Sequence, residues 1–251
     1  MKLFIHRSIT IGLIVSSIII SSLLDNKFNA LALTPEQIMQ KLNQIPVFTI
    51  GNSKEILLSD NDNKKIFVTY LNHQDAQQVV ENITKENPER QVKVITIPLG
   101  KVYQLLKDKQ KSESQGPPDL FTFVPGKKQL TSALSILKKE DPTADTFPGI
   151  PLFYGMVTVD KKKTFLSINY DKESFTPFYF ERESLQKLIE TIKKQQPELA
   201  SSIEVKVTQL EGILSAFEKN DKEQERFAKS VVLVPSEDSA KKLLEILKED
   251  K

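Results

Sequence analysis

Residues 45–48 read IPVF, and residues 150–153, 105 positions further along the chain, read IPLF. A second pair of matching segments follows in the same order, because the Val-Pro of residues 124–125 recurs as the Val-Pro of residues 234–235. Each of these Val-Pro pairs precedes a segment with apolar residues at helical spacing. Matches that keep their order at a nearly constant shift predict an internal duplication.

The segments between these landmarks match as well. Tyr70 corresponds to Tyr179 at a shift of 109, and a helical pattern follows each tyrosine. Both patterns stop before a proline, Pro88 in the first copy and Pro197 in the second. We therefore predict an α/β protein made of two pseudosymmetric halves, each with a mixed β-sheet packed by α-helices.

The periodicity gives the expected elements of each half. Thr34 as N-cap and Pro35 in the first turn predict a short N-terminal helix. In the first half we expect strands at 47–50, 55–58, 65–71, 91–97 and 120–124, and helices at 74–86, 99–107 and 126–139. In the second half we expect a hairpin of 152–159 and 164–170, strands at 176–180, 203–207 and 231–234, and helices at 183–195, 208–218 and 237–248.

The first 32 residues have a different character. A basic start is followed by an apolar run over 8–24 and by the small-x-small sequence of residues 30–32, Ala-Leu-Ala. This is typical of a secretory signal peptide, and an uncleaved membrane anchor is the alternative. The expected organisation is a signal peptide at 1–32, an N-terminal half at 33–141 and a C-terminal half at 142–251. The two halves could also form one continuous domain.

Composition restricts the chemistry. The chain has 251 residues, 39% of them hydrophobic, with 14 phenylalanines, two histidines and no cysteine. Disulfides, thiolate catalysis and zinc fingers are therefore excluded. The formal net charge is +2 and falls to zero without residues 1–32, so nothing favours nucleic acid as a partner. These counts favour a protein that is not an enzyme.

The sequence offers no strong catalytic or metal-binding motif. His73 could act as a general base, but its place at a helix start favours an ordinary surface residue. Residues 60–63, Asp-Asn-Asp-Asn, begin like a calcium loop, yet Lys65 stands where the glycine belongs, so a hairpin turn is expected. The three lysines at 161–163 predict a solvated turn. We expect no catalytic residue, no metal site and no cofactor.

The aromatic strands are more informative. Phe48 and Phe153 occupy matching positions, and Phe178, Tyr179 and Phe180 follow one another on a predicted strand. Such side chains fill a core or line an exposed apolar groove that could bind extended polypeptide. We predict that these five residues lie near client-binding grooves.

The chain resembles the twenty-two-kilodalton Tic protein family, which is named for the translocon at the inner chloroplast envelope. The resemblance rests on residues 33–38 (LTPEQI), 45–50 (IPVFTI) and 149–153 (GIPLF), together with Val124-Pro125. It implies a two-fold pseudosymmetric α/β structure with an apolar pocket on each half. Plant and apicomplexan members aid precursor import between the envelope membranes. Cyanobacterial members are periplasmic or lumenal and are linked to outer-membrane biogenesis and the Omp85-type assembly machinery.

This resemblance leads to an expected function. The protein would be a soluble periplasmic, chaperone-like transport factor that binds unfolded precursors or outer-membrane proteins, and it would be peripheral to membranes at most. An equivalent intermembrane space or the thylakoid lumen is the alternative location. The competing functions are an exported hydrolase using paired carboxylates and a scaffold that bridges membrane proteins.

Overall fold

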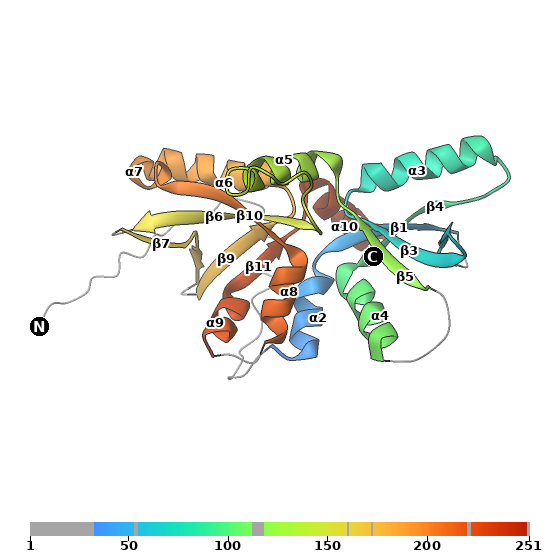
Figure 1. Cartoon of the computed structure of the whole chain (residues 1–251), viewed down its shortest axis with the longest axis horizontal. Coiled ribbons are helices and arrows are strands. Elements are labelled where there is room, and N and C mark those ends of the chain that lie inside the picture. The colour runs from blue at the N-terminus through green and yellow to red at the C-terminus, as the bar shows by residue number, and fades with distance from the viewer. Residues whose placement is uncertain are drawn as a thin grey trace, which may run out of the picture.

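The computed structural model describes residues 33–52, 55–111, 118–159, 161–171, 173–219 and 222–249, and the predicted signal peptide lies outside them. Two β-sheets form the middle of the molecule, between an upper and a lower layer of helices (Figure 1). Both sheets contain parallel and antiparallel pairs. The predicted mixed α/β class is confirmed.

The first sheet has the strand order β2-β3-β1-β4, and β5 pairs in parallel with β3. Its strands are β1 (Pro46–Gly51), β2 (Ser59–Asn61), β3 (Lys64–Tyr70), β4 (Lys93–Pro98) and β5 (Leu120–Val124). The helices of this part of the chain are α2 (Pro35–Asn43), α3 (His73–Glu86), α4 (Leu99–Lys111) and α5 (Lys127–Leu137).

The second sheet has the order β10-β6-β9-β11, with β7 on β6 and β8 on β9. Its strands are β6 (Pro151–Val159), β7 (Lys162–Phe165), β8 (Ile168–Tyr170), β9 (Glu173–Tyr179), β10 (Ile203–Gln209) and β11 (Val231–Val234). The helices are α6 (Arg182–Gln195), α7 (Pro197–Ala200), α8 (Leu210–Glu218), α9 (Lys222–Ser230) and α10 (Glu237–Glu249).

The two sheets pair their strands at matching residues. Phe48 of β1 lies opposite Tyr70 of β3, and Phe153 of β6 lies opposite Tyr179 of β9. The carbonyl of Ile45 accepts a hydrogen bond from the amide N–H of Leu99 at 2.8 Å. The carbonyl of Ile150 accepts one from Leu210 at the same distance. The sequence shift had related Phe48 to Phe153, Tyr70 to Tyr179 and Ile45 to Ile150, and the structure adds the pair Leu99 and Leu210. A tandem duplication as their origin stays a prediction.

One helix of each half lies on the sheet of the other half. Helix α5 packs on β6 and β10, where its Ala133 and Ile136 join a core cluster with Phe153 and Leu185. Helix α10 packs against β1 and lies between α5 and α3 in the upper layer (Figure 1). The connection β5–α5 therefore runs from the first half to the second sheet, and β11–α10 runs from the second half to the first sheet. The division into domains at 141/142 stays a prediction.

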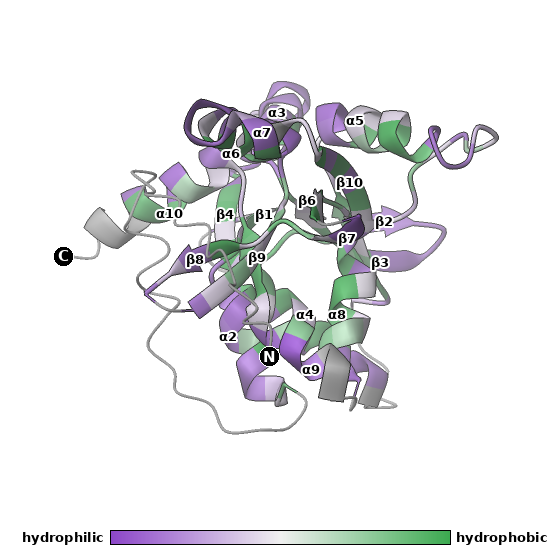
Figure 2. Ribbon diagram, turned by 90° about the vertical axis from the view of Figure 1, so that its left-hand side faces the viewer, coloured by the Kyte–Doolittle hydropathy of each residue, from purple (hydrophilic) through white to green (hydrophobic). Residues whose placement is uncertain are grey.

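The larger core cluster also joins the two halves. It includes Val47 and Phe67 of the first sheet together with Leu152 and Phe178 of the second. The lower helices α2, α4 and α8 add buried apolar residues to the same cluster. Figure 2 shows apolar residues on these helices and on the strands above them. Because burial of apolar area is the main stabilising term, the halves stabilise each other.

Two predicted strands differ from the structure. The strand expected at 55–58 is absent apart from a bridge between Gly51 and Ile56, and the true hairpin strand β2 begins at Ser59. Its turn is made by Asp62 and Asn63 with φ of 48° and 62°, which these residue types tolerate. The hairpin strand expected at 164–170 is divided: β7 pairs with β6, and β8 pairs with β9.

Helices α7 and α9 are the elements that the sequence did not predict. The apolar residues of helix α9 are Phe227 and Ala228, which are adjacent, so they do not repeat at the i, i+3, i+4 spacing that indicates a helix. Helix α7 is four residues long and begins at Pro197, the proline that had indicated a helix end. All helices that the sequence predicted are present in the structure.

Candidate functional site

The structure places all five predicted groove residues inside the molecule. Phe48 and Phe153 are 0% exposed, Phe178 is 1% exposed, and Tyr179 and Phe180 are each 8% exposed. None of them therefore faces an open groove in this conformation. Their role in client binding stays a prediction, and it requires the helices that cover them to move.

Helices cover both faces of the second sheet. On one face, Phe153 and Tyr179 pack with apolar residues of α5 and α6. On the other face, the Phe178 ring stacks against Tyr154 at 5.0 Å and meets Phe227 of α9 edge-on at 5.9 Å between centroids. Because α9 was not predicted from the sequence, its packing against Phe178 was not predicted either.

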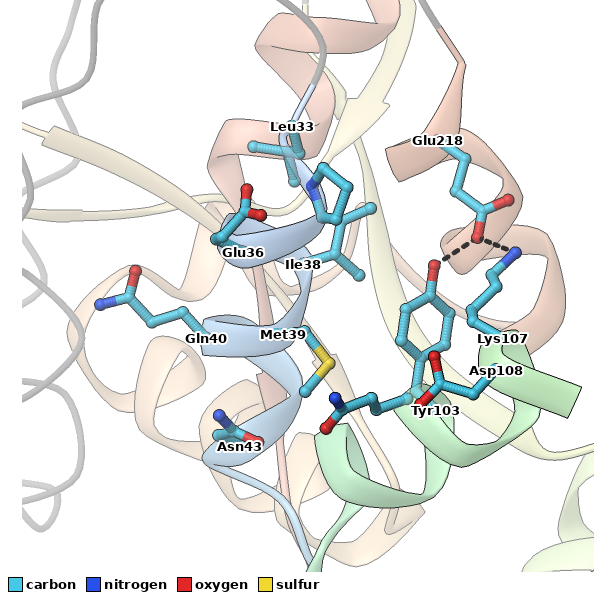
Figure 3. Close-up of a pocket in the computed structure, with 12 residues that line it drawn as sticks. Leu33, Glu36, Ile38, Met39, Gln40, Asn43, Tyr103, Lys107, Asp108 and Glu218 are labelled. Atoms are coloured by element: carbon cyan, nitrogen blue, oxygen red, sulfur yellow. Dashed lines mark hydrogen bonds and ion pairs between the residues drawn. The ribbon is translucent and has the colours of Figure 1, made fainter. Parts of the chain in front are cut away.

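An open pocket lies in the lower layer, between α2, α4 and the end of α8 (Figure 3). Its volume is about 740 Å³, within the range typical of ligand-binding pockets. Leu33 and Ile38 are buried at its base, and Met39 points from α2 toward α4. The lining residues are Leu33, Pro35, Glu36, Ile38, Met39, Gln40, Asn43, Tyr103, Gln104, Lys107, Asp108 and Glu218.

Local sequence features fix α2 beside this pocket. Thr34 caps the helix, since its hydroxyl accepts from the Gln37 amide at 3.3 Å while the Gln37 side chain accepts from the Thr34 amide at 2.9 Å. The predicted cap at Thr34, with Pro35 in the first turn, is confirmed. Gly100 allows α2 to approach α4, because a Cβ there would lie 2.1 Å from Oδ1 of Asn43.

Three polar side chains connect α4 to α8 at the pocket wall. The hydroxyl of Tyr103 donates to Oε1 of Glu218 at 2.5 Å, and Nζ of Lys107 lies 2.8 Å from the same oxygen. Lys107 Nζ also lies 5.4 Å from the centre of the Tyr103 ring, in cation–π geometry. The Tyr103 ring is thus held at a fixed place in the wall.

The ionisation of these groups follows from their contacts. Burial, the hydrogen bond to Glu218 and its negative charge together raise the pKa of Tyr103. Burial alone would raise the pKa of Glu218, but the hydrogen bonds from Lys107 and Tyr103 outweigh it and the pKa is lowered. The Thr34 hydroxyl lowers the pKa of Glu36. Both glutamates therefore carry a negative charge at neutral pH.

These shifts bear on the hydrolase alternative. A hydrolase with two carboxylates needs one carboxyl whose pKa is raised, so that it can act as a general acid. In this pocket the pKa values of Glu36 and Glu218 are both shifted downward. Neither of these two glutamates has the raised pKa that a general acid requires.

His73 begins a helix, as the sequence indicated, but it is half-buried rather than an ordinary surface residue. It is the first residue of α3, and its ring meets the ring of Phe48 edge-on at 5.2 Å between centroids. Across the described ranges, no group of three or more His, Asp or Glu side chains is arranged to hold a metal ion. No helix in those ranges has the length and apolar character needed to cross a bilayer.

The family model of the Tic22-like family matches residues 15–245. The chain belongs to the Tic22-like family. Its fold is similar to that of Anabaena Tic22 (protein transport), with a TM-score of 0.69 and 23% identity over 85% of this chain and 97% of that one. It is also similar to Tic22 from Plasmodium falciparum, with a TM-score of 0.63 and 24% identity over 85% of this chain and 99% of that one. No curated protein sequence matches it.

The resemblance seen in the sequence is thereby confirmed, and at these identities the solved structures show the fold alone. The pocket residues Tyr103, Lys107 and Glu218 were not predicted. The spacing of Tyr103 and Lys107 puts them on one face of a helix, but Glu218 lies 115 positions beyond Tyr103, and no local pattern links them.

Proposed function

We propose that this protein is a soluble periplasmic, chaperone-like transport factor that binds unfolded precursor or outer-membrane proteins. The observation that carries the proposal is membership of the Tic22-like family, whose Anabaena member is named for protein transport. The secretory character of residues 1–32 supports export to the periplasm. Omp85-type assembly machinery is the proposed recipient of the clients.

The described surface supports a binding role. The pocket between α2 and α4 combines apolar walls with a polar rim, which suits contacts that tolerate many client sequences. Met39 is flexible and polarisable, so it can adapt to different partners. The five buried aromatic residues could add further contacts after a helix moves.

The test is an aggregation assay. An outer-membrane protein unfolded in urea is diluted into buffer with or without the full chain, and light scattering is recorded. We expect the chain to slow aggregation and to bind the unfolded client, but not the same client already folded in detergent. The soluble domains of an Omp85 protein are added in a second experiment, where we expect direct binding.

The outcomes separate the competing functions. If the chain neither slows aggregation nor binds the Omp85 domains, the client-handling proposal is wrong. Stable binding to the Omp85 domains without affinity for unfolded client would indicate the scaffold instead.

A further inference from the structure

The pocket between α2, α4 and α8 has a charge as well as a shape. Three carboxylates line it, those of Glu36, Asp108 and Glu218, and Lys107 is the one basic side chain among its described lining residues. The Lys107 ammonium already pairs with Glu218 at 2.8 Å. The lining therefore has a net negative charge at neutral pH.

The apolar part of the same lining comes from α2 and from the residues just before it. Leu33 and Ile38 form the base, and Met39 extends toward the Tyr103 ring (Figure 3). That ring already lies 5.4 Å from one ammonium group, so its π face is suited to cations. A ligand that fits these walls has apolar and cationic side chains close together.

The geometry points to a ligand class: we propose that this pocket binds short segments of unfolded chain in which lysine or arginine alternates with apolar residues. This inference rests on the proposed function and adds which client segments are recognised and where. The apolar side chains would contact Met39 and Ile38, and a cation would face the carboxylate of Glu36. Charge complementarity gives orientation, and apolar burial gives most of the affinity.

The test uses a fluorescent short peptide of alternating leucine and lysine, with a leucine–glutamate peptide of the same length as control. Binding to the full chain is measured by fluorescence anisotropy at low and at physiological salt. We expect the lysine peptide to bind, the glutamate peptide not to bind, and added salt to weaken binding. Equal binding of both peptides would overturn the charge assignment.

The pocket is tested by the double variant Glu36→Gln, Asp108→Asn. Because it removes two exposed charges, which water screens, we expect roughly two- to fivefold weaker binding of the lysine peptide. Glu198→Gln is the matched control, since Glu198 also follows a proline in the first turn of a helix but lies outside the pocket. Unchanged binding by the double variant would place the peptide elsewhere and overturn the inference.

Met39→Lys provides a second, independent variant, because it puts a cation into the apolar wall. We expect it to abolish binding of the lysine peptide, and retained binding would contradict the proposed site. The aggregation assay separates the two proposals. A chain that slows client aggregation but does not bind the lysine peptide keeps the proposed function and loses this inference, whereas failure of the assay itself removes the proposed function.

Discussion

The two sheets share their strand pairings, but the helices beneath them differ. Gly100 near the start of α4 corresponds to Glu211 near the start of α8, because Leu99 and Leu210 make matching hydrogen bonds. A side chain at Gly100 would collide with Asn43 of α2. Glu211 instead accepts a hydrogen bond from the amide of Ile150 at 3.4 Å.

This difference shows how two similar sheets come to have unequal surfaces. The missing side chain at Gly100 permits the close approach of α2 to α4. Helix α2 packs closely on α4 and only lightly on α8, so the pocket lies on the α4 side. Binding by this protein need not be symmetric, even though four strands of each sheet pair in the same pattern.

The largest effects are expected at the matching core residues Phe48 and Phe153. Both are completely buried, so truncation of either to alanine should lower the free energy of unfolding by about 3–5 kcal/mol. The shared core and the exchanged helices predict one cooperative transition for both variants, measured by circular dichroism in urea. Two separate transitions in either variant would show that the halves unfold independently.

The difference between the starts of α4 and α8 can be tested by substituting one glycine in each helix. Gly100→Ala should destabilise the protein by about 1–3 kcal/mol, because the new methyl group meets Asn43 and the carbonyl of Met39. Gly212→Ala in α8 should stabilise it by about 0.5–1 kcal/mol, because the nearest atom is 3.8 Å away. Thermal unfolding of both variants checks these signs, and equal shifts would contradict the proposed asymmetry.

Lys41 connects the two halves through a largely buried ammonium. Its Nζ donates to the carbonyls of Lys229 and Val231 at 3.2 and 2.8 Å, and burial lowers its pKa to about 8. The unfolded chain binds this proton more tightly. The free energy of unfolding should therefore rise by about 1–1.5 kcal/mol between pH 7 and 9, and this gain is lost as the pH falls through 8.

Urea unfolding at several pH values measures this effect. Above pH 9 the raised pKa values of Tyr70, Tyr103, Tyr154 and Tyr179 act in the opposite direction, because the unfolded chain loses those protons first. The comparison is therefore confined to pH 7–9. Lys41→Met should remove the rise, and a slope that persists in this variant would assign it to another group.

The sequence predicted the strands better than it predicted which helices pack on each sheet. Residues 45–48 and 150–153 indicated β1 and β6, and apolar periodicity indicated α3 and α6. Periodicity shows that a helix buries one face, but it does not say against which sheet, so the exchange of α5 and α10 was not predicted. For the same reason Phe48 and Phe178 could not be assigned to core or groove. The pocket could not be predicted either, because the fold brings together Tyr103 and Glu218, which are far apart in the sequence.

The exchanged helices are held by residues at matching positions, Gln129 on α5 and Ser239 on α10. The Gln129 side chain accepts from the Arg182 amide at 3.0 Å and donates to Glu183 at 2.8 Å. The Ser239 hydroxyl accepts from the nearby Ser236 hydroxyl at 2.9 Å, and its bond to the other half is the long one that it donates to the carbonyl of Leu71 at 3.4 Å. Because Gln129 makes two short bonds, Gln129→Ala should cost about 1–2 kcal/mol and Ser239→Ala about 1 kcal/mol or less. Denaturant unfolding of both variants measures the order, and the reverse order would contradict it.

The smallest effects are expected at exposed ion pairs, one on each sheet. Lys65 lies 2.7 Å from Asp60, and Lys163 lies 3.0 Å from Glu204. All four side chains are at least 45% exposed, so water and salt screen the attraction, and ordering two long side chains offsets much of it. Lys65→Ala and Lys163→Ala should each change the free energy of unfolding by less than about 0.5 kcal/mol. Urea unfolding at low and high salt measures both variants. A large loss in one variant alone would mean that its sheet depends on surface charge, and the asymmetry would then extend from the lower helices to the strands.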